Sequence, residues 1–184
     1  MHLYSYPEKN HLKNDKSVKL YNILLPLWLI IFLPSYLWLA LIPLNYIIDR
    51  AVLRWSLGGM PDKGLFCRKH TWKICLAGFL SDLAGSLILL GVSIPVSEIS
   101  EKFYDIGHAI MFDPFSNLIG LLMVIASIAV SAACIYFLDK RILGKAGLEP
   151  EQVRRSAIRL ALITAPYLYL FPSRLLYENG ILGT

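Results

Sequence analysis

Four long apolar segments constrain the fold of this chain more than any other feature of its sequence. Each contains 23 residues or more, and about 20 helical residues are enough to cross the hydrocarbon core of a bilayer. The composition agrees, because only 17% of the residues are charged, whereas soluble domains carry roughly 25%. The sequence therefore predicts an all-α, polytopic membrane helix bundle with apolar segments at 22–48, 72–95, 114–138 and 156–178.

The length of 184 residues indicates a single integral membrane domain, 1–184. Residues 1–21 form a basic tail with four lysines, and no part of the chain is left over for a soluble domain. The first apolar segment is longer than the apolar part of a signal peptide and is followed by no small-residue cleavage site, so we expect it to be retained. The three cysteines have no paired spacing, which predicts neither a disulfide framework nor a zinc site.

Basic residues lie beside the apolar segments and predict the orientation of the chain. Loops 49–71 and 139–155, with the adjoining helix edges, each bring six Lys or Arg residues, whereas loop 96–113 contains only Lys102. Loops enriched in Lys and Arg are normally cytoplasmic. We therefore expect a cell-membrane protein with loops 49–71 and 139–155 in the cytoplasm and with loop 96–113 and the C-terminus outside. The net charge of +5 suits the anionic cytoplasmic face of a lipid bilayer, and no basic stripe predicts nucleic-acid binding.

The first segment leaves two topologies open. If it crosses the membrane once, the basic tail lies outside, and the Lys and Arg residues divide as 12 inside and 6 outside. If it enters and returns on the same side, the division becomes 16 to 2. Proline removes a helix hydrogen bond, and the candidates for the apex of such a re-entrant hairpin are Pro34, Ser35 and Tyr36. The alternative is a kinked helix that spans the membrane, which is the commoner structure.

Loop 96–113 carries apolar and polar residues on different faces of a helix. The polar face contains Glu98, Glu101, Asp105 and His108 at helical spacing. This pattern predicts an amphipathic helix at about 96–112 that lies in the outer membrane interface. The acidic row is typical of a solvated face, although such groups can also gather cations, and the sequence leaves open whether a metal ion binds there.

Asp82 is the most informative residue, because it lies near the middle of the second apolar segment. An aspartate at that depth costs about 2.5–3.5 kcal/mol on insertion scales, so it normally faces other helices and marks an ion or proton path. Hydroxyl groups fall at a similar depth in the third and fourth segments, and Pro166 frees the carbonyl of Leu162. The predicted pathway candidates are Asp82, Ser81, Ser86, Ser127, Ser131, Thr164 and Tyr167. The alternative is a structural aspartate, protonated or hydrogen-bonded, that holds the helices together.

Small residues recur at four-residue spacing in the second and fourth segments. Such stripes let membrane helices approach each other closely. We therefore predict that helix packing involves Ala77, Gly78, Gly85, Ala157, Ala161 and Ala165.

Motifs of known enzyme classes are missing from the sequence. There is no HExxH, GxSxG, CxxC or Walker pattern, so we expect no catalytic residue and no cofactor. One hypothesis is a cation- or proton-conducting channel or transporter subunit that uses Asp82. It would form a homo-oligomer, because three or four spans are few to enclose a pathway. The other hypothesis is a non-catalytic accessory subunit that assembles with a larger membrane complex.

Overall fold

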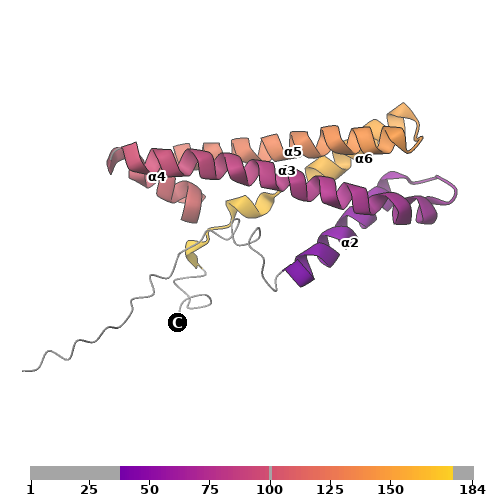
Figure 1. Cartoon of the computed structure of the whole chain (residues 1–184), viewed down its shortest axis with the longest axis horizontal. Helices are drawn as coiled ribbons and strands as arrows, with labels where there is room; N and C mark the ends of the chain where they lie inside the picture. The colour runs from indigo at the N-terminus through magenta and orange to yellow at the C-terminus, as the bar shows by residue number, and fades with distance from the viewer. Residues whose placement is uncertain (1–37, 100, 176–184) are drawn as a thin grey trace, which may run out of the picture.

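A computed structural model describes residues 38–99 and 101–175, and this part of the chain consists of helices joined by short connections, with no strand (Figure 1). The all-α prediction is therefore confirmed. The elements in chain order are α2 (Trp38–Ser56), α3 (Lys63–Ile99), α4 (Glu101–Phe112), the 3-10 turn η1 (Pro114–Ser116), α5 (Leu118–Lys145), α6 (Pro150–Ile163) and the 3-10 turn η2 (Tyr167–Leu170).

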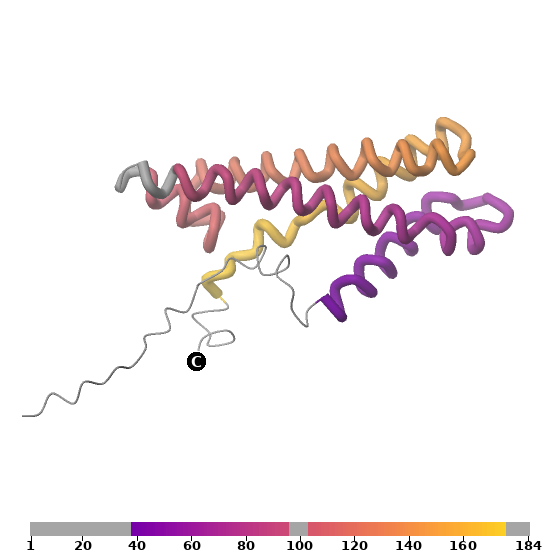
Figure 2. The backbone as a smooth tube through the Cα atoms, viewed as in Figure 1, coloured from indigo at the N-terminus to yellow at the C-terminus, as the bar shows by residue number. Residues whose placement is uncertain are grey.

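Helices α3 and α5 form a long antiparallel pair that runs the length of the molecule (Figure 2). Among the described residues, two helices are long and apolar enough to cross a membrane: Lys63–Pro95 within α3, and α5. They correspond to the second and third predicted segments. We call the end of the pair at the 57–62 and 146–149 connections the basic end, and the opposite end, where α4 lies, the α4 end.

At the α4 end the chain reverses through two capped helix starts. Asp113 Oδ1 accepts a hydrogen bond from the Phe115 N–H (3.3 Å), and Asn117 Oδ1 accepts from the Ile119 N–H (2.9 Å). These caps satisfy N–H groups that have no partner within their own helix. The caps let α5 start at Leu118 and return along α3.

The amphipathic helix predicted at 96–112 begins later than expected. Residues 96–99 continue α3, with Pro95 inside that helix, and α4 begins only at Glu101. Proline removes one backbone hydrogen bond, but the helix continues for a further turn. Helix α4 packs on both α3 and α5, and a Cβ atom added at Gly120 would lie 2.7 Å from Ala109 Cβ. The apolar face of α4 is therefore covered, at least in part, by protein.

The fourth apolar segment does not form the continuous helix expected over 156–178. Helix α6 begins at Pro150, where a proline is tolerated because it stands in the first turn, and ends at Ile163. Pro166 has no N–H to offer the Leu162 carbonyl, and proline disfavours a helical conformation in the residue before it. The Leu162 carbonyl instead accepts a hydrogen bond from the Tyr167 hydroxyl. The chain then continues through η2, and residues 176–178 lie outside the described part.

Helix α2 includes residues 38–48 of the first apolar segment and extends beyond it to Ser56, and residues 22–37 of that segment lie outside the described part. It packs against α3 and α6 near the basic end and diverges from α3 towards Trp38 (Figure 1). The Trp38 ring stacks on Phe79 of α3, with ring centroids 6.0 Å apart. The proposed apex at Pro34, Ser35 and Tyr36 lies outside the described residues, so both topologies of this segment stay predictions.

Two apolar clusters hold the helices together. The α4-end core joins α3, α4, α5 and η2 and consists of Leu89, Ile110, Val124, Ile128, Ala165 and Tyr169. The basic-end core joins α2, α3, α5 and α6 and consists of Val52, Leu53, Leu57, Cys67, Ile74, Ile135, Leu143, Val153, Leu160 and Ala161.

Candidate functional site

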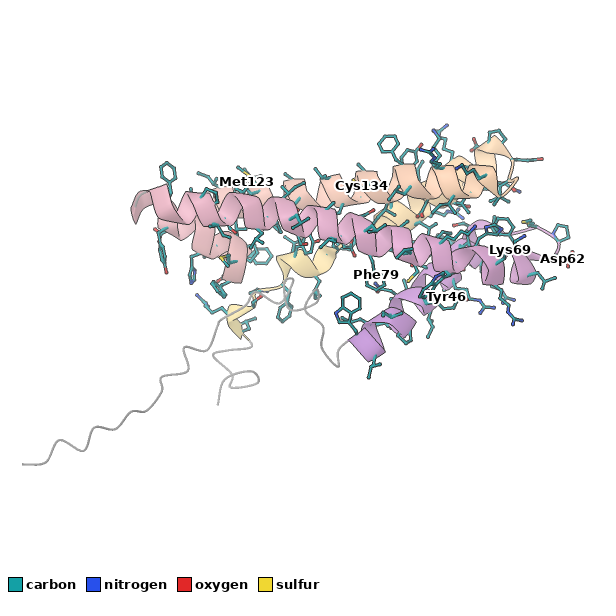
Figure 3. The ribbon with its side chains drawn as sticks, in the orientation of Figure 1. Tyr46, Asp62, Lys69, Phe79, Met123 and Cys134 are labelled. Atoms are coloured by element: carbon teal, nitrogen blue, oxygen red, sulfur yellow. The ribbon has the colours of Figure 1, made fainter. Side chains whose placement is uncertain are left out.

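A cavity of about 240 Å³ lies between α2, α3 and the segment where α6 breaks into η2. Phe79 of α3 lines it, on the side of the bundle where α2 and α3 diverge (Figure 3). Most of the wall is apolar. Its polar side chains are Asn45 and Asp49 from α2, Cys75 and Asp82 from α3, and Thr164, Tyr167 and Tyr169 from the broken segment.

Asp82 reaches this cavity from the middle of α3. Its Oδ1 atom is buried and has no hydrogen-bond partner among the described residues. Its backbone carbonyl accepts a hydrogen bond from the Tyr169 hydroxyl, which crosses from η2. The neighbouring Ser81 hydroxyl donates its hydrogen bond to the Ala77 carbonyl of the same helix (2.8 Å) rather than to the Asp82 carboxyl. The structure therefore presents the Asp82 carboxyl to the cavity and supplies no protein donor for Oδ1.

The hydroxyl layer predicted around Asp82 is brought together only in part. Ser127 donates to the Gly85 carbonyl (2.7 Å) and thereby joins α5 to α3. Ser86 and Ser131 lie beside the Tyr169 phenol. Thr164 lines the cavity, and its hydroxyl donates to the Leu160 carbonyl (2.9 Å).

Tyr169, which the sequence did not single out, contacts Asp82 through its hydroxyl, and the predicted Tyr167 lines the same cavity. The Tyr169 side chain is 2% exposed, whereas Tyr167 is 51% exposed and bonds within its own broken helix. Sequence counting assumed a regular helix through this segment. The 3-10 turn after Pro166 changes which residue faces α3, because its rotation per residue differs from that of an α-helix.

The small residues of α3 and α6 lie at different kinds of contact. Gly85 faces α5 so closely that an added Cβ atom would lie 2.0 Å from Ser131 Oγ. Gly78 instead borders the cavity. The remaining predicted packing residues are buried, and they are Ala77, Ala157, Ala161 and Ala165.

Asp49 is a second carboxyl in the cavity wall and was missed by the sequence analysis. It lies in α2, outside the two long apolar helices, and is 5% exposed. Burial raises the pKa of its carboxyl to about 7, although a hydrogen bond with the buried Cys75 thiol acts in the opposite direction. A signal was present, because Val52, Leu53 and Ser56 follow Asp49 at helical spacing and share its buried face.

Asp139 is a third buried carboxyl that the sequence analysis missed, since it was counted in a basic loop. Helix α5 runs through it to Lys145, and Asp139 is 0% exposed. Neither of its carboxyl oxygens has a hydrogen-bond partner among the described residues. Its position four residues after Ile135 and four before Leu143 places it on the buried stripe of α5, which was the available signal.

The acidic face predicted near residues 98–108 shows no gathered ligand set. Asp105 and His108 are exposed on α4, and the His108 ring lies against Tyr104 and Phe112, with centroids 6.1 and 5.1 Å away. The side chains of Glu98 and Glu101 lie outside the described part. Among the described residues, no three His, Cys, Asp or Glu side chains are grouped so that they could hold a metal ion.

Comparisons with known proteins gave no match to a protein family, to a curated protein or to a solved structure.

Proposed function

We propose that this chain is a subunit of a small multi-pass channel or transporter that conducts a cation or a proton through the cavity between α2, α3 and the α6–η2 break. The observation that carries the proposal is that two carboxyls, the buried Asp49 and the half-buried Asp82, line one cavity beside a long apolar helix pair. Carboxyls at such positions are costly and usually mark an ion or proton path.

The broken helix supports the same conclusion. The cavity wall includes Ile163, Thr164 and Pro166, at the C-terminal end of α6. The last carbonyl groups of a helix have no intrahelical partner and give that end a partial negative charge. In many transporters, discontinuous helices place such ends at the coupling-ion site. A helix end and two carboxyls around one cavity favour a positively charged occupant.

The protonation behaviour of Asp49 also supports this function. A carboxyl with a pKa of about 7 exchanges its proton near neutral pH, which suits a group that loads and releases protons. Its neighbour Asp82 lies within electrostatic range, so that a charge on one carboxyl affects the other.

In this proposal the chain acts in the cell membrane as a homo-oligomer or within a larger membrane complex. Two long apolar helices are few to enclose a pathway, and symmetric assembly is the common solution for small subunits. The predicted loops 49–71 and 139–155 are largely helical, with connections only at 57–62 and 146–149. Their Lys and Arg residues still gather at the basic end, which in this proposal faces the cytoplasm. The α4 end and the C-terminus then face outside.

The test is flux through purified protein in liposomes under imposed proton, Na⁺ and K⁺ gradients. Asp82→Asn and Asp49→Asn keep the side-chain size but remove the charge, and both should fold normally and lose flux. Asp105→Asn is the matched control, because it makes the same change at an exposed carboxyl on α4, and it should conduct like the wild type. Wild-type protein that conducts under none of these gradients would refute the proposal and favour an accessory subunit.

A further inference from the structure

The basic-end core contains polar atoms that the described protein does not satisfy. Both Asp139 oxygens lack a partner, and so do the buried hydroxyls of Ser56 in α2 and Ser156 in α6. Each lies in a helix stretch that contributes apolar side chains to this core. Three of the four helices that form this core thus each carry a buried polar side chain without a hydrogen-bond partner among the described residues.

These buried polar atoms destabilise the folded protein unless another group forms hydrogen bonds with them. A buried polar atom without a partner costs about 1–3 kcal/mol, and an isolated buried charge costs far more. No cationic side chain pairs with Asp139 within 4.0 Å among the described residues. The neutral carboxyl is the form that such surroundings tolerate, and a neutral carboxyl can both donate and accept a hydrogen bond.

Asp139 also continues the line of carboxyls that starts at the cavity. Asp49 lies within electrostatic range of both Asp82 and Asp139. On α5, Asp139 follows Ser131 by eight residues, which is about 12 Å along a helix axis. Ser131 lies at the level of Tyr169 and Asp82. Asp49, which is hydrogen-bonded to Cys75 seven residues before Asp82 on α3, and Asp139 therefore both lie on the basic-end side of Asp82.

We infer that the pathway carries protons rather than metal ions, and that Asp139 is the carboxyl through which protons pass between the cavity and the basic end. The inference rests on the proposed function. The Asp139 carboxylate takes a proton from the cavity side to form the neutral acid, and it then releases that proton to water at the basic end. Water that enters between Ser56 and Ser156 would bond their hydroxyls and relay the proton, so no redox partner is required.

The surroundings of Asp139 distinguish a proton from a metal ion. A cation such as Ca²⁺ takes about 6–8 oxygen ligands, whereas Asp139 is 0% exposed and neither of its oxygens has a hydrogen-bond partner among the described residues. A proton needs only a hydrogen-bonded chain of groups that can exchange it. The sealed carboxyl therefore fits proton transfer and would obstruct a larger ion.

The experiment compares full-length wild type, Asp139→Asn and Asp62→Asn in liposomes with an internal pH dye, with Na⁺ flux measured in parallel. Wild-type protein should carry protons and not Na⁺, and Asp139→Asn should fall to the protein-free level while remaining folded. Asp62 is an exposed carboxyl at the basic end, with a φ of 57° that asparagine also adopts. Asp62→Asn should therefore conduct like the wild type.

The outcomes separate this inference from the proposed function. Wild-type flux of Na⁺ or K⁺ without protons would overturn the inference and leave the proposed function standing. Proton flux that survives in Asp139→Asn but is lost in Asp82→Asn would also overturn the inference and leave the proposed function standing. If Asp139→Asn fails to fold, Ser156→Ala replaces it, and unchanged proton flux in that variant would count against the relay. No flux at all in the wild type would refute both.

Discussion

The two ends of the α3–α5 helix pair differ in whether their polar side chains have hydrogen-bond partners. At the α4 end, Asn117 caps α5, Asp113 caps η1, and the Ser116 hydroxyl donates to the Asp113 carbonyl (2.7 Å). Asp113 also forms an ion pair with Arg174 (3.5 Å). At the basic end, buried atoms of Ser56, Asp139 and Ser156 have no partner within the described part.

At the α4 end the polar groups are satisfied by hydrogen bonds within the protein. In the half towards the basic end, buried polar atoms need further hydrogen-bond partners. Within the described residues, the unpartnered buried atoms run from Asp82 and Ser131 towards the basic end, and none lies at the α4 end. A partly satisfied polar network destabilises a protein core, so its presence calls for water or a transferred proton. The unpartnered polar groups therefore lie in the half of the molecule that the proposed function uses.

The largest effect is expected where the two halves meet, at Gly85. In Gly85→Leu the new side chain would collide with Ser131 on α5, and overpacking of this kind costs about 1–3 kcal/mol or more. Gly91→Leu makes the same change on the same helix, where an added Cβ atom meets nothing within 4 Å. Thermal unfolding of both variants in the same detergent should show a large decrease in the unfolding temperature of Gly85→Leu and little change in that of Gly91→Leu. Equal tolerance of both changes would show that α3 and α5 are not in close contact at Gly85.

Replacing an aspartate at each end should change the free energy of unfolding in opposite directions. Asp113→Ala removes a cap and an ion pair at the α4 end and should lower the free energy of unfolding by about 1 kcal/mol. Asp139→Leu removes orphaned oxygens at the basic end and should raise it by about 1–3 kcal/mol, although it should abolish proton flux. Denaturant unfolding of both variants measures the difference. A clear destabilisation by Asp139→Leu would mean that Asp139 has a stabilising partner.

The smallest effect is expected at the tyrosines that border the Asp82 layer. Tyr169→Phe removes the hydroxyl that donates to the Asp82 carbonyl and should cost about 1 kcal/mol. Tyr167→Phe removes a bond to the Leu162 carbonyl at an exposed position and should cost less, because water can replace the hydroxyl. Equal losses in the two variants would show that Tyr169 does not connect η2 to α3 in the way described.

Local patterns in the sequence were enough to predict the parts of the fold that depend on a single helix. The second and third apolar segments predicted the two long helices. Asp82 could be singled out because a carboxylate inside a long apolar run is visible without knowledge of its neighbours. Pro166 indicated a freed carbonyl, but the number of residues per turn after it could not be read from the sequence.

The tertiary structure alone decided which carboxyls share the site. Asp49 and Asp139 stand next to basic residues, Arg50 and Lys140, and in the sequence they look like ordinary loop charges. Their burial depends on α2 and α6 packing against the long helix pair. Hydropathy along one helix records how each residue interacts with lipid or water, and so it located the spans and Asp82. Burial between helices depends on contacts between segments far apart in the chain, and so only the packed structure brought Asp49 and Asp82 to one cavity and enclosed Asp139.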